Sequence, residues 1–219
     1  ALVTNTTGTG NAAVGFNSLY TNTGSNNTAC GHSAVQLNST GTGITGIGKS
    51  ALFNNSTGDS NTAVGYPPAA ANTTGTNNTG IGSQSLYSNT TASHNTAVGM
   101  NSLVTNTTGA SNTAVGMQAL NSNTTGGYNV GIGKNALLSN TTSNYNVGIG
   151  ANALSNNTAS ENTAIGYNAG KEITSGTRNT VLGYAALDAA TTGDDNVAIG
   201  QAALSNATTA SNNTAVGRL

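Results

Sequence analysis

Apolar, small and polar residues recur with one fixed period along this chain. From Asn11 onward a unit reads approximately N-T-A-V-G-x-x-A-L-x-x-N-T-T-G-x-x, and 13 copies of this 17-residue unit follow one another; the units beginning at Asn11 and Asn146 have 16 residues. We number the unit positions 1 to 17 from the opening Asn, which Ile44 replaces in one unit. Such a period predicts a solenoid with one coil per unit, because a single unit cannot bury its apolar face alone.

Positions 2 to 5 have the pattern of a β-strand. Position 4 is apolar in every unit, position 5 is always Gly, and position 3 is Ala or Gly except at Val181. This alternation predicts a short strand with positions 2 and 4 facing the interior. Positions 3 and 5 would then form a flat outer face almost without side chains, which we expect to be an oligomer contact.

The second half of the unit predicts a return to the same interior. Leu at position 9, as in Leu19 and Leu187, is expected to point inward from a second short strand. Asn at position 12 and Gly at position 15, as in Asn106 and Gly109, are expected to form a bend with positive φ at the glycine. A helix is excluded because Thr, Asn and Gly crowd every window. Asn is never followed by Gly, the pair that two-residue hairpins prefer, which favours parallel coils over an antiparallel meander.

The sequence therefore predicts an all-β, parallel β-solenoid of about 13 coils, with residues 1–219 forming a single repeat array. The Asn residues at position 1 should form a row of amides bonded along the stack. The chain begins at position 8 and stops at position 7 without a cap. We therefore expect either an excerpt of a longer fibrous protein or ends that stack on other copies.

Composition narrows the function. Only 5% of residues are charged and the net charge is −1, so no basic stripe for nucleic acid can form. No apolar run is long enough to span a membrane, so no membrane insertion by this segment is expected. Cys30 is the one cysteine, which excludes an internal disulfide; because it occupies position 4, we expect a small core residue.

No catalytic, cofactor-binding or metal-binding residues are predicted. His32 and His94 lie nearly four turns apart along the chain, and Asp194 and Asp195 are expected in a solvated bend. Residues 43–50 read G-I-T-G-I-G-K-S and match the phosphate-loop consensus, but no helix is expected to follow them, so no phosphate loop is predicted. No nucleophile, base and orienting acid converge, so an enzyme is not expected.

Two features depart from the repeat or decorate it. Pro67–Pro68 replaces the usual turn in one unit and is expected to form a bulge or an outside corner, while residues 170–173 break the pattern in another. Aromatic residues at position 6 are expected to be partly buried, with an outward row for glycan or protein contact as the alternative; they are Phe16, Tyr66, Tyr167 and Tyr184.

The strand motif resembles a known family. N-T-A-V-G-x-x-A, and N-V-A-I-G-Q-A-A at residues 196–203, are similar to the head repeats of YadA-like trimeric autotransporter adhesins and to the repeat region of phage-type tail-fibre proteins. The resemblance covers essentially the whole chain and implies a left-handed β-roll with three chains side by side. The unit is longer than the adhesin repeat, so no binding residues are transferred from the family.

The expected function is a structural and adhesive fibre segment, a rigid stalk or head that mediates attachment. It would be extracellular, at a cell surface or in a virion tail fibre, self-associating as a homotrimer and contacting a host or neighbour-cell surface protein or glycan. One alternative is the subunit of an end-to-end stacked filament. The other is an ice-binding β-solenoid, with Thr rows at positions 13 and 14.

Overall fold

A computed structural model of the chain describes residues 1–218. These residues form 13 three-residue strands, one in each repeat unit, and no helix. The strands are β1 (Ala12–Val14), β2 (Thr28–Cys30), β3 (Thr45–Ile47), β4 (Thr62–Val64), β5 (Thr79–Ile81), β6 (Thr96–Val98), β7 (Thr113–Val115), β8 (Val130–Ile132), β9 (Val147–Ile149), β10 (Thr163–Ile165), β11 (Thr180–Leu182), β12 (Val197–Ile199) and β13 (Thr214–Val216).

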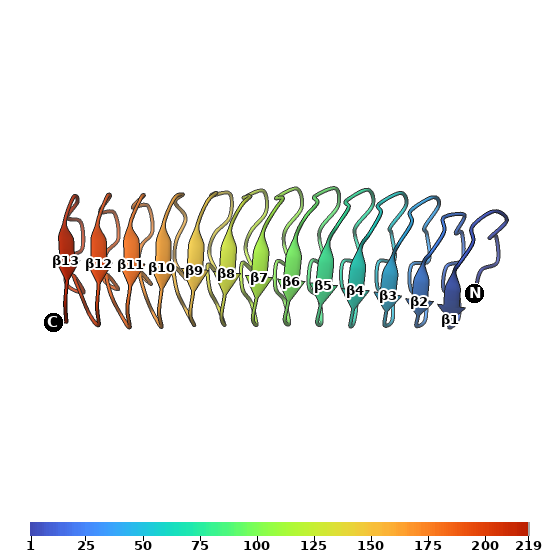
Figure 1. Cartoon of the computed structure of the whole chain (residues 1–219), viewed down its shortest axis with the longest axis horizontal. Coiled ribbons are helices and arrows are strands. Elements are labelled where there is room, and N and C mark those ends of the chain that lie inside the picture. Colours follow the sequence, from blue (N-terminus) through green and yellow to red (C-terminus); the bar gives the residue numbers. More distant parts are fainter. Residues whose placement is uncertain (219) are drawn as a thin grey trace. The chain divides into compact units, whose positions relative to one another are not determined.

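The chain divides into two compact units. The first spans Ala1–Ser111 and contains β1–β6; the second starts at Asn112 and contains β7–β13. Within each unit, neighbouring strands lie side by side in chain order and pair in parallel (Figure 1). Like positions pair with like, as in Thr62 with Thr79 and Val130 with Val147. The predicted parallel β-solenoid is confirmed in both units.

The two shorter repeats keep this register. Ala12 pairs with Thr28 and Val147 with Thr163, steps of 16 residues instead of 17. Both strand pairs remain parallel and in phase. The missing residue is therefore taken up in the bend outside the strand.

The interior of each coil is filled from positions 3, 8 and 9. Leu52 and Leu137 at position 9 are fully buried, as are Ala63 and Ala114 at position 3. The Leu of one coil packs on position 3 of the next coil. A Cβ added to Gly131 would lie 3.3 Å from Cγ of Leu120, tighter than ordinary van der Waals contact. Only Ala or Gly therefore fits at most of these strand centres.

The predicted facing of the strands is wrong. Positions 2 and 4 point outward and position 3 points inward, since Val14 is 66% exposed and Leu182 46% exposed while Ala63 is buried. The physical reason is volume, because the Leu at position 9 already occupies the narrow interior. The outer face consists of β-branched side chains, and the flat Ala/Gly oligomer stripe does not exist.

The second predicted strand is also absent, because position 9 lies in a turn. Leu52 and Leu137 have φ of 50° and 54°, in the left-handed region that costs an L-residue about 1–2 kcal/mol. Burial of the side chain offsets this by about 1.5–3 kcal/mol. The N–H of Leu120 also donates to the carbonyl of Ala136 in the next coil at 3.0 Å.

Glycine serves two different purposes in the coil. At position 5 it provides positive φ, 134° at Gly65, where a Cβ would also lie 2.8 Å from the carbonyl oxygen of Gly82. At position 15 we expected positive φ, and this is wrong: Gly41 is not among the positive-φ residues. It is needed because a Cβ there would lie 2.6 Å from the carbonyl oxygen of Gly58 in the next coil.

The predicted row of amides at position 1 is confirmed within each unit. The backbone N–H of Asn78 donates to Oδ1 of Asn61 at 2.9 Å, and Nδ2 of Asn61 donates to the carbonyl of Gly75 at 2.7 Å. These side chains are buried, so each amide must bond to protein because water cannot reach it. The row ties each coil to the next inside the solenoid.

A second buried amide row runs along position 12, where only bend capping was expected. Nδ2 of Asn55 donates to Oδ1 of Asn38 at 3.0 Å and to the carbonyl of Gly58 at 2.9 Å. The sequence signal for it was available. Position 12 is Asn in ten consecutive coils, from Asn5 to Asn157.

Candidate binding surfaces

The outer sheet face, formed by positions 2 and 4 of the strands, is a regular surface that runs along each unit. In the first unit its position-4 row is apolar throughout, and position 2 is Thr in every strand except β1. The strands carry no charged residue, and Ile47, Ile81 and Ile132 are exposed. A row of exposed apolar side chains without charges is typical of a surface that another molecule covers.

Cys30 belongs to this face, so its assignment to the core is wrong. It pairs with Val14 on one side and Ile47 on the other, and it is exposed. The cause is the reversed facing of the strand. The thiol is accessible from outside the coil.

The position-6 aromatic side chains point outward, which favours the outward-row alternative over partial burial. Phe16, Tyr66, Tyr167 and Tyr184 are between 48% and 68% exposed. Tyr167 and Tyr184 stack with ring centroids 5.4 Å apart, and Phe16 lies 5.3 Å from His32. Coil-to-coil stacking brings residues 16 or 17 positions apart into contact.

A further aromatic pair lies at position 17 and was not expected. The rings of Tyr128 and Tyr145 stack at 5.3 Å with an interplanar angle of 13°, and both side chains are exposed. The signal was their spacing of one repeat. Stacked rings of this kind contribute roughly 0.5–1.5 kcal/mol beyond their buried area.

A hollow of about 280 Å³ interrupts the surface of the first unit beside the unusual Pro-Pro coil. We call it the aromatic notch; it is lined by Ser50, Phe53, Asn54, Tyr66, Pro67, Ala70 and Tyr87. Nζ of Lys49 lies 5.4 Å from the centroid of the Tyr66 ring, within cation–π range. The notch thus combines three aromatic side chains with polar groups and one nearby positive charge.

The proline pair lies in the bend that follows β4, where a bulge or an outside corner is predicted, and Pro68 is buried. Pro67 follows β4, whose pairing with β3 and β5 is regular, so no bulge interrupts the sheet. The residues at this corner position in the neighbouring coils, Ser50 and Gln84, have φ of 58° and 57°. Proline cannot adopt that conformation and has no N–H to donate, so this corner differs from its neighbours.

Charged side chains gather in the last coils of the second unit. Oδ1 of Asp194 accepts the backbone N–H of Thr177 at 2.7 Å and its hydroxyl at 3.0 Å, and these bonds hold the pKa of Asp194 below its ordinary value. Asp195 pairs with Arg178, whose Nε and Nη2 donate at 2.6 and 2.8 Å and lower the pKa of the Asp195 carboxyl. The predicted solvated bend is confirmed.

A second ion pair lies on the neighbouring corner. Nζ of Lys171 is 2.9 Å from Oε1 of Glu172, and Nδ2 of Asn156 donates to Oε2 of the same carboxylate at 2.7 Å. Both bonds lower the pKa of Glu172, the Lys171 bond most strongly. The ion pair lies within one coil, and the bond from Asn156 joins that coil to the preceding one.

The histidines and acidic groups do not assemble a metal site. Within residues 1–218, no three His, Cys, Asp or Glu side chains lie close enough together to hold a metal ion. His32 contacts Phe16, whereas Nε2 of His94 lies 3.5 Å from Nδ2 of Asn77. Each histidine takes part in its own coil-to-coil contact.

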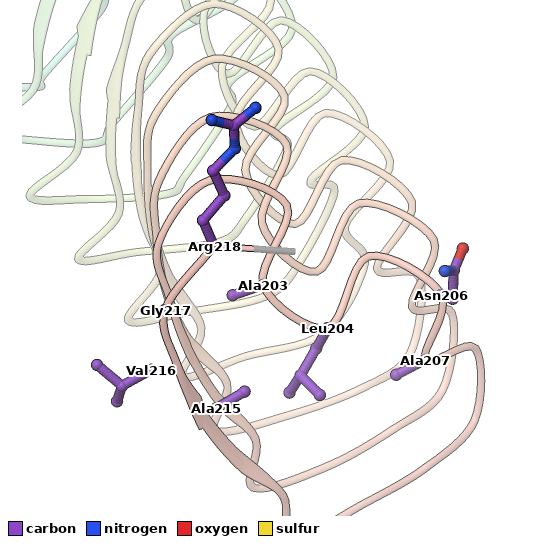
Figure 2. A pocket seen from close by; sticks show the side chains of 8 residues that line it. All are labelled: Ala203, Leu204, Asn206, Ala207, Ala215, Val216, Gly217 and Arg218. Carbon is purple, nitrogen blue, oxygen red and sulfur yellow. The ribbon is translucent and has the colours of Figure 1, made fainter.

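Another hollow opens at the last described coil (Figure 2). Its lining residues are Ala203, Leu204, Asn206, Ala207, Ala215, Val216, Gly217 and Arg218. Ala215 points into the coil together with Ala203 and Leu204, whereas Val216 points away from it. The view shows the reversed strand facing directly. Because residue 219 lies outside the described residues, we assign no ligand to this hollow.

Neither a membrane-spanning helix among the described residues nor a similar protein was found for this chain. The described part of the chain, residues 1–218, contains no helix with the length and apolarity needed to cross a bilayer. Comparison with protein-family models, with curated proteins and with solved structures found no match to this chain.

Proposed function

We propose that this chain is a segment of a structural, adhesive fibre, located outside the cell or on a virion, in which the outer sheet faces of three copies associate side by side. The observation that carries the proposal is the exposed apolar row at position 4. Position 4 is apolar in every strand, exposed in eight of them and partly exposed in the other five, and no charge interrupts the row.

The distribution of side chains supports association through this face. The interior of most coils is filled by Leu and Asn, so the β-branched residues outside are not required for the coil itself. A chain that did not associate with other copies would leave Ile47, Ile81 and Ile132 exposed to water. Burying them in an interface stabilises an assembly by about 25 cal/mol per Å² of apolar area.

The repeat also supports a mechanical role. Two buried amide rows and a backbone bond at nearly every corner connect consecutive coils in each unit. Such connections resist separation of the coils along the stack. A rigid stalk that holds an attachment surface needs this property, and the resemblance to adhesin and tail-fibre repeats agrees with it.

Cys30 offers a direct test because it lies on the outer sheet face. We expect native mass measurement to give a trimer and a short bis-maleimide to join Cys30 of neighbouring copies. Each chain has one thiol, so the covalent product is a pair even within a trimer. The double variant Ile81→Glu/Ile132→Glu should dissociate the assembly, because like charges would be buried together.

The matched control is Thr57→Glu/Thr125→Glu, which places the same charges at exposed position-14 sites. It should leave the trimer intact. A monomer at high concentration, or a trimer indifferent to Glu at positions 81 and 132, would contradict the proposal.

The end-to-end filament and the ice-binding solenoid stay alternative predictions. For ice binding, the position-13 hydroxyls are engaged in the stack, as when Oγ1 of Thr73 donates to the carbonyl of Thr90 at 3.0 Å. Thermal hysteresis equal to that of buffer would exclude ice binding. Electron micrographs showing only short discrete particles at high concentration would exclude the filament.

A further inference from the structure

The aromatic notch arises from a local change in one outward row. Position 10 is occupied by Phe53, Ala70 and Tyr87 in three consecutive coils. The coils are in contact there, since the N–H of Asn54 donates to the carbonyl of Ala70 and that of Ala71 to the carbonyl of Tyr87, both at 3.1 Å. Alanine between two aromatic residues therefore leaves a gap in the row.

The gap is large enough for one six-membered ring of a ligand. Adjacent parallel strands are about 4.8 Å apart, so the backbones that carry Phe53 and Tyr87 are separated by roughly 10 Å. Phe53 and Tyr87 border the hollow along the stack, and Tyr66 and Pro67 complete its lining. An extended peptide or an acyl chain would need an open groove, whereas this hollow is bounded at both ends.

The chemistry of the lining suits a sugar. Aromatic side chains contact the apolar C–H face of a pyranose, and Ser50 and Asn54 provide polar groups for its hydroxyls. Pockets that combine aromatic surface with a few polar groups bind small molecules in a defined orientation.

One uncompensated charge lies beside the notch. Lys49 is the only Lys or Arg among residues 1–111, and no salt bridge involves it in the described chain. The only acidic residue of that unit, Asp59, instead accepts the N–H and hydroxyl of Thr42. The positive charge is therefore available to an anionic ligand.

We propose that the aromatic notch binds one pyranose ring of an acidic glycan, with the sugar's apolar face against Phe53 and Tyr87 and its carboxylate paired with Lys49. The inference rests on the proposed adhesive function and names the ligand class that one of its surfaces would recognise. Affinity for a single ring is weak, and an assembly that presents several notches would raise it by avidity.

The test is ligand-observed saturation-transfer NMR on the full chain with tetragalacturonic acid, 3′-sialyllactose and neutral lactose. We expect saturable binding of an acidic probe, with saturation strongest on ring C–H protons, and at least about tenfold weaker binding of lactose. Lys49→Gln should remove most of the difference between acidic and neutral sugars.

A substitution that fills the gap gives the most direct test of binding in the notch. Ala70→Leu should abolish binding without unfolding the coil, since Leu138 occupies the same position in another coil. Ser205→Leu makes a comparable change at position 10 far along the chain and should have no effect. Tyr87→Ala should weaken binding about tenfold or more.

The outcomes separate this inference from the proposed function. If none of the three probes shows binding that Ala70→Leu removes, or if Ser205→Leu weakens binding equally, the notch is not a sugar site, even if the trimer forms. If the Ile81→Glu/Ile132→Glu monomer still binds the probe, the notch inference holds independently of assembly.

Discussion

Two stretches of the second unit fill the same place inside the coil in different ways. In the coils of Asn123, Asn140 and Asn157, position 12 continues the buried amide row. In the next two coils the same position is Ile173 and Ala190, which are also fully buried. Both stretches keep the parallel strand pairing, so the fold accepts a polar or an apolar interior at this position.

The difference shows how the neighbouring amides adapt. Where position 12 is Asn, Nδ2 of the following position-1 Asn donates to it in some coils, as from Asn146 to Oδ1 of Asn140 at 3.3 Å, and stays within its own row in others, as from Asn129 to Oδ1 of Asn112 at 3.2 Å. Beyond Ile173, Nδ2 of Asn179 donates to Oδ1 of Asn162 at 3.1 Å, within its own row. The buried amide is satisfied in both cases, which is what burial requires.

The apolar stretch also carries a compensating change in volume. Position 9 is Gly170 in the coil of Ile173, and a Cβ there would lie 2.9 Å from Cδ1 of Ile173. A position-9 Leu normally contacts position 3 of the next coil, and here that position is Val181. Among all units, Val181 is the only position-3 residue larger than Ala. Positions 3, 9 and 12 therefore form one coupled set, complete in either version.

The largest loss of stability is expected when an apolar residue replaces Asn at position 12 in the amide stretch. Asn140→Ile removes the bonds from Nδ2 to Oδ1 of Asn123 and to the carbonyl of Ser143. It also crowds Leu137, because no glycine makes room there. We expect a loss of about 3 kcal/mol or more, measured by urea unfolding and by hydrogen exchange of the adjacent coils.

Asn206→Ala, at an exposed site, is the control and should stay within about 0.5 kcal/mol of the parent. An Asn140→Ile protein as stable as the parent would show that the amide row is dispensable at any coil.

The second prediction concerns the coupled set itself. Val181→Ala alone should leave a cavity and cost about 2 kcal/mol, and Gly170→Leu alone should collide with Ile173 and cost about 1–3 kcal/mol. The triple variant Gly170→Leu/Ile173→Asn/Val181→Ala should recover most of both losses. It recreates the common set, and Leu adopts positive φ at this position elsewhere, as at Leu154.

Thermal unfolding of the single, double and triple variants measures the coupling. Simple additivity of the changes would mean that the three positions act independently, contrary to the packing described above.

The smallest effect we expect is a selective response to acid. The carboxylates with lowered pKa, Glu172, Asp194 and Asp195, all lie in the stretch beyond Ile165, whereas the amide stretch at 129–157 has Lys134 as its only charge. A carboxylate whose pKa is lowered in the folded state stabilises the fold at pH values above its unfolded-state pKa. This stability is lost as the pH falls through the folded-state pKa. Hydrogen-exchange protection should therefore decline first beyond Ile165 as pH drops below about 4.

Arg178→Gln should lower the hydrogen-exchange protection of the stretch beyond Ile165 at neutral pH, since Asp195 would lose its partner. The further loss of protection in acid should then be smaller. Equal acid sensitivity of the two stretches would show that these exposed pairs contribute nothing local.

Much of the fold could be predicted from the repeat alone. The period, the parallel stacking and the amide row at position 1 follow from the sequence, because identical units stacked in register place each residue on its own copy. The candidate surfaces were harder to predict, because a notch depends on side chains from three successive coils.

The sequence by itself determined that residues 2 to 4 of each unit form a strand and that its two sides differ. Only the tertiary structure decided which side lies inside. Hydrophobicity alone would bury the Val and Ile of position 4, but Leu at position 9 and the two Asn rows already fill a coil too narrow for them. Competition for volume, which no single strand reveals, left room for Ala or Gly and placed the β-branched residues, together with Cys30, on the outer face.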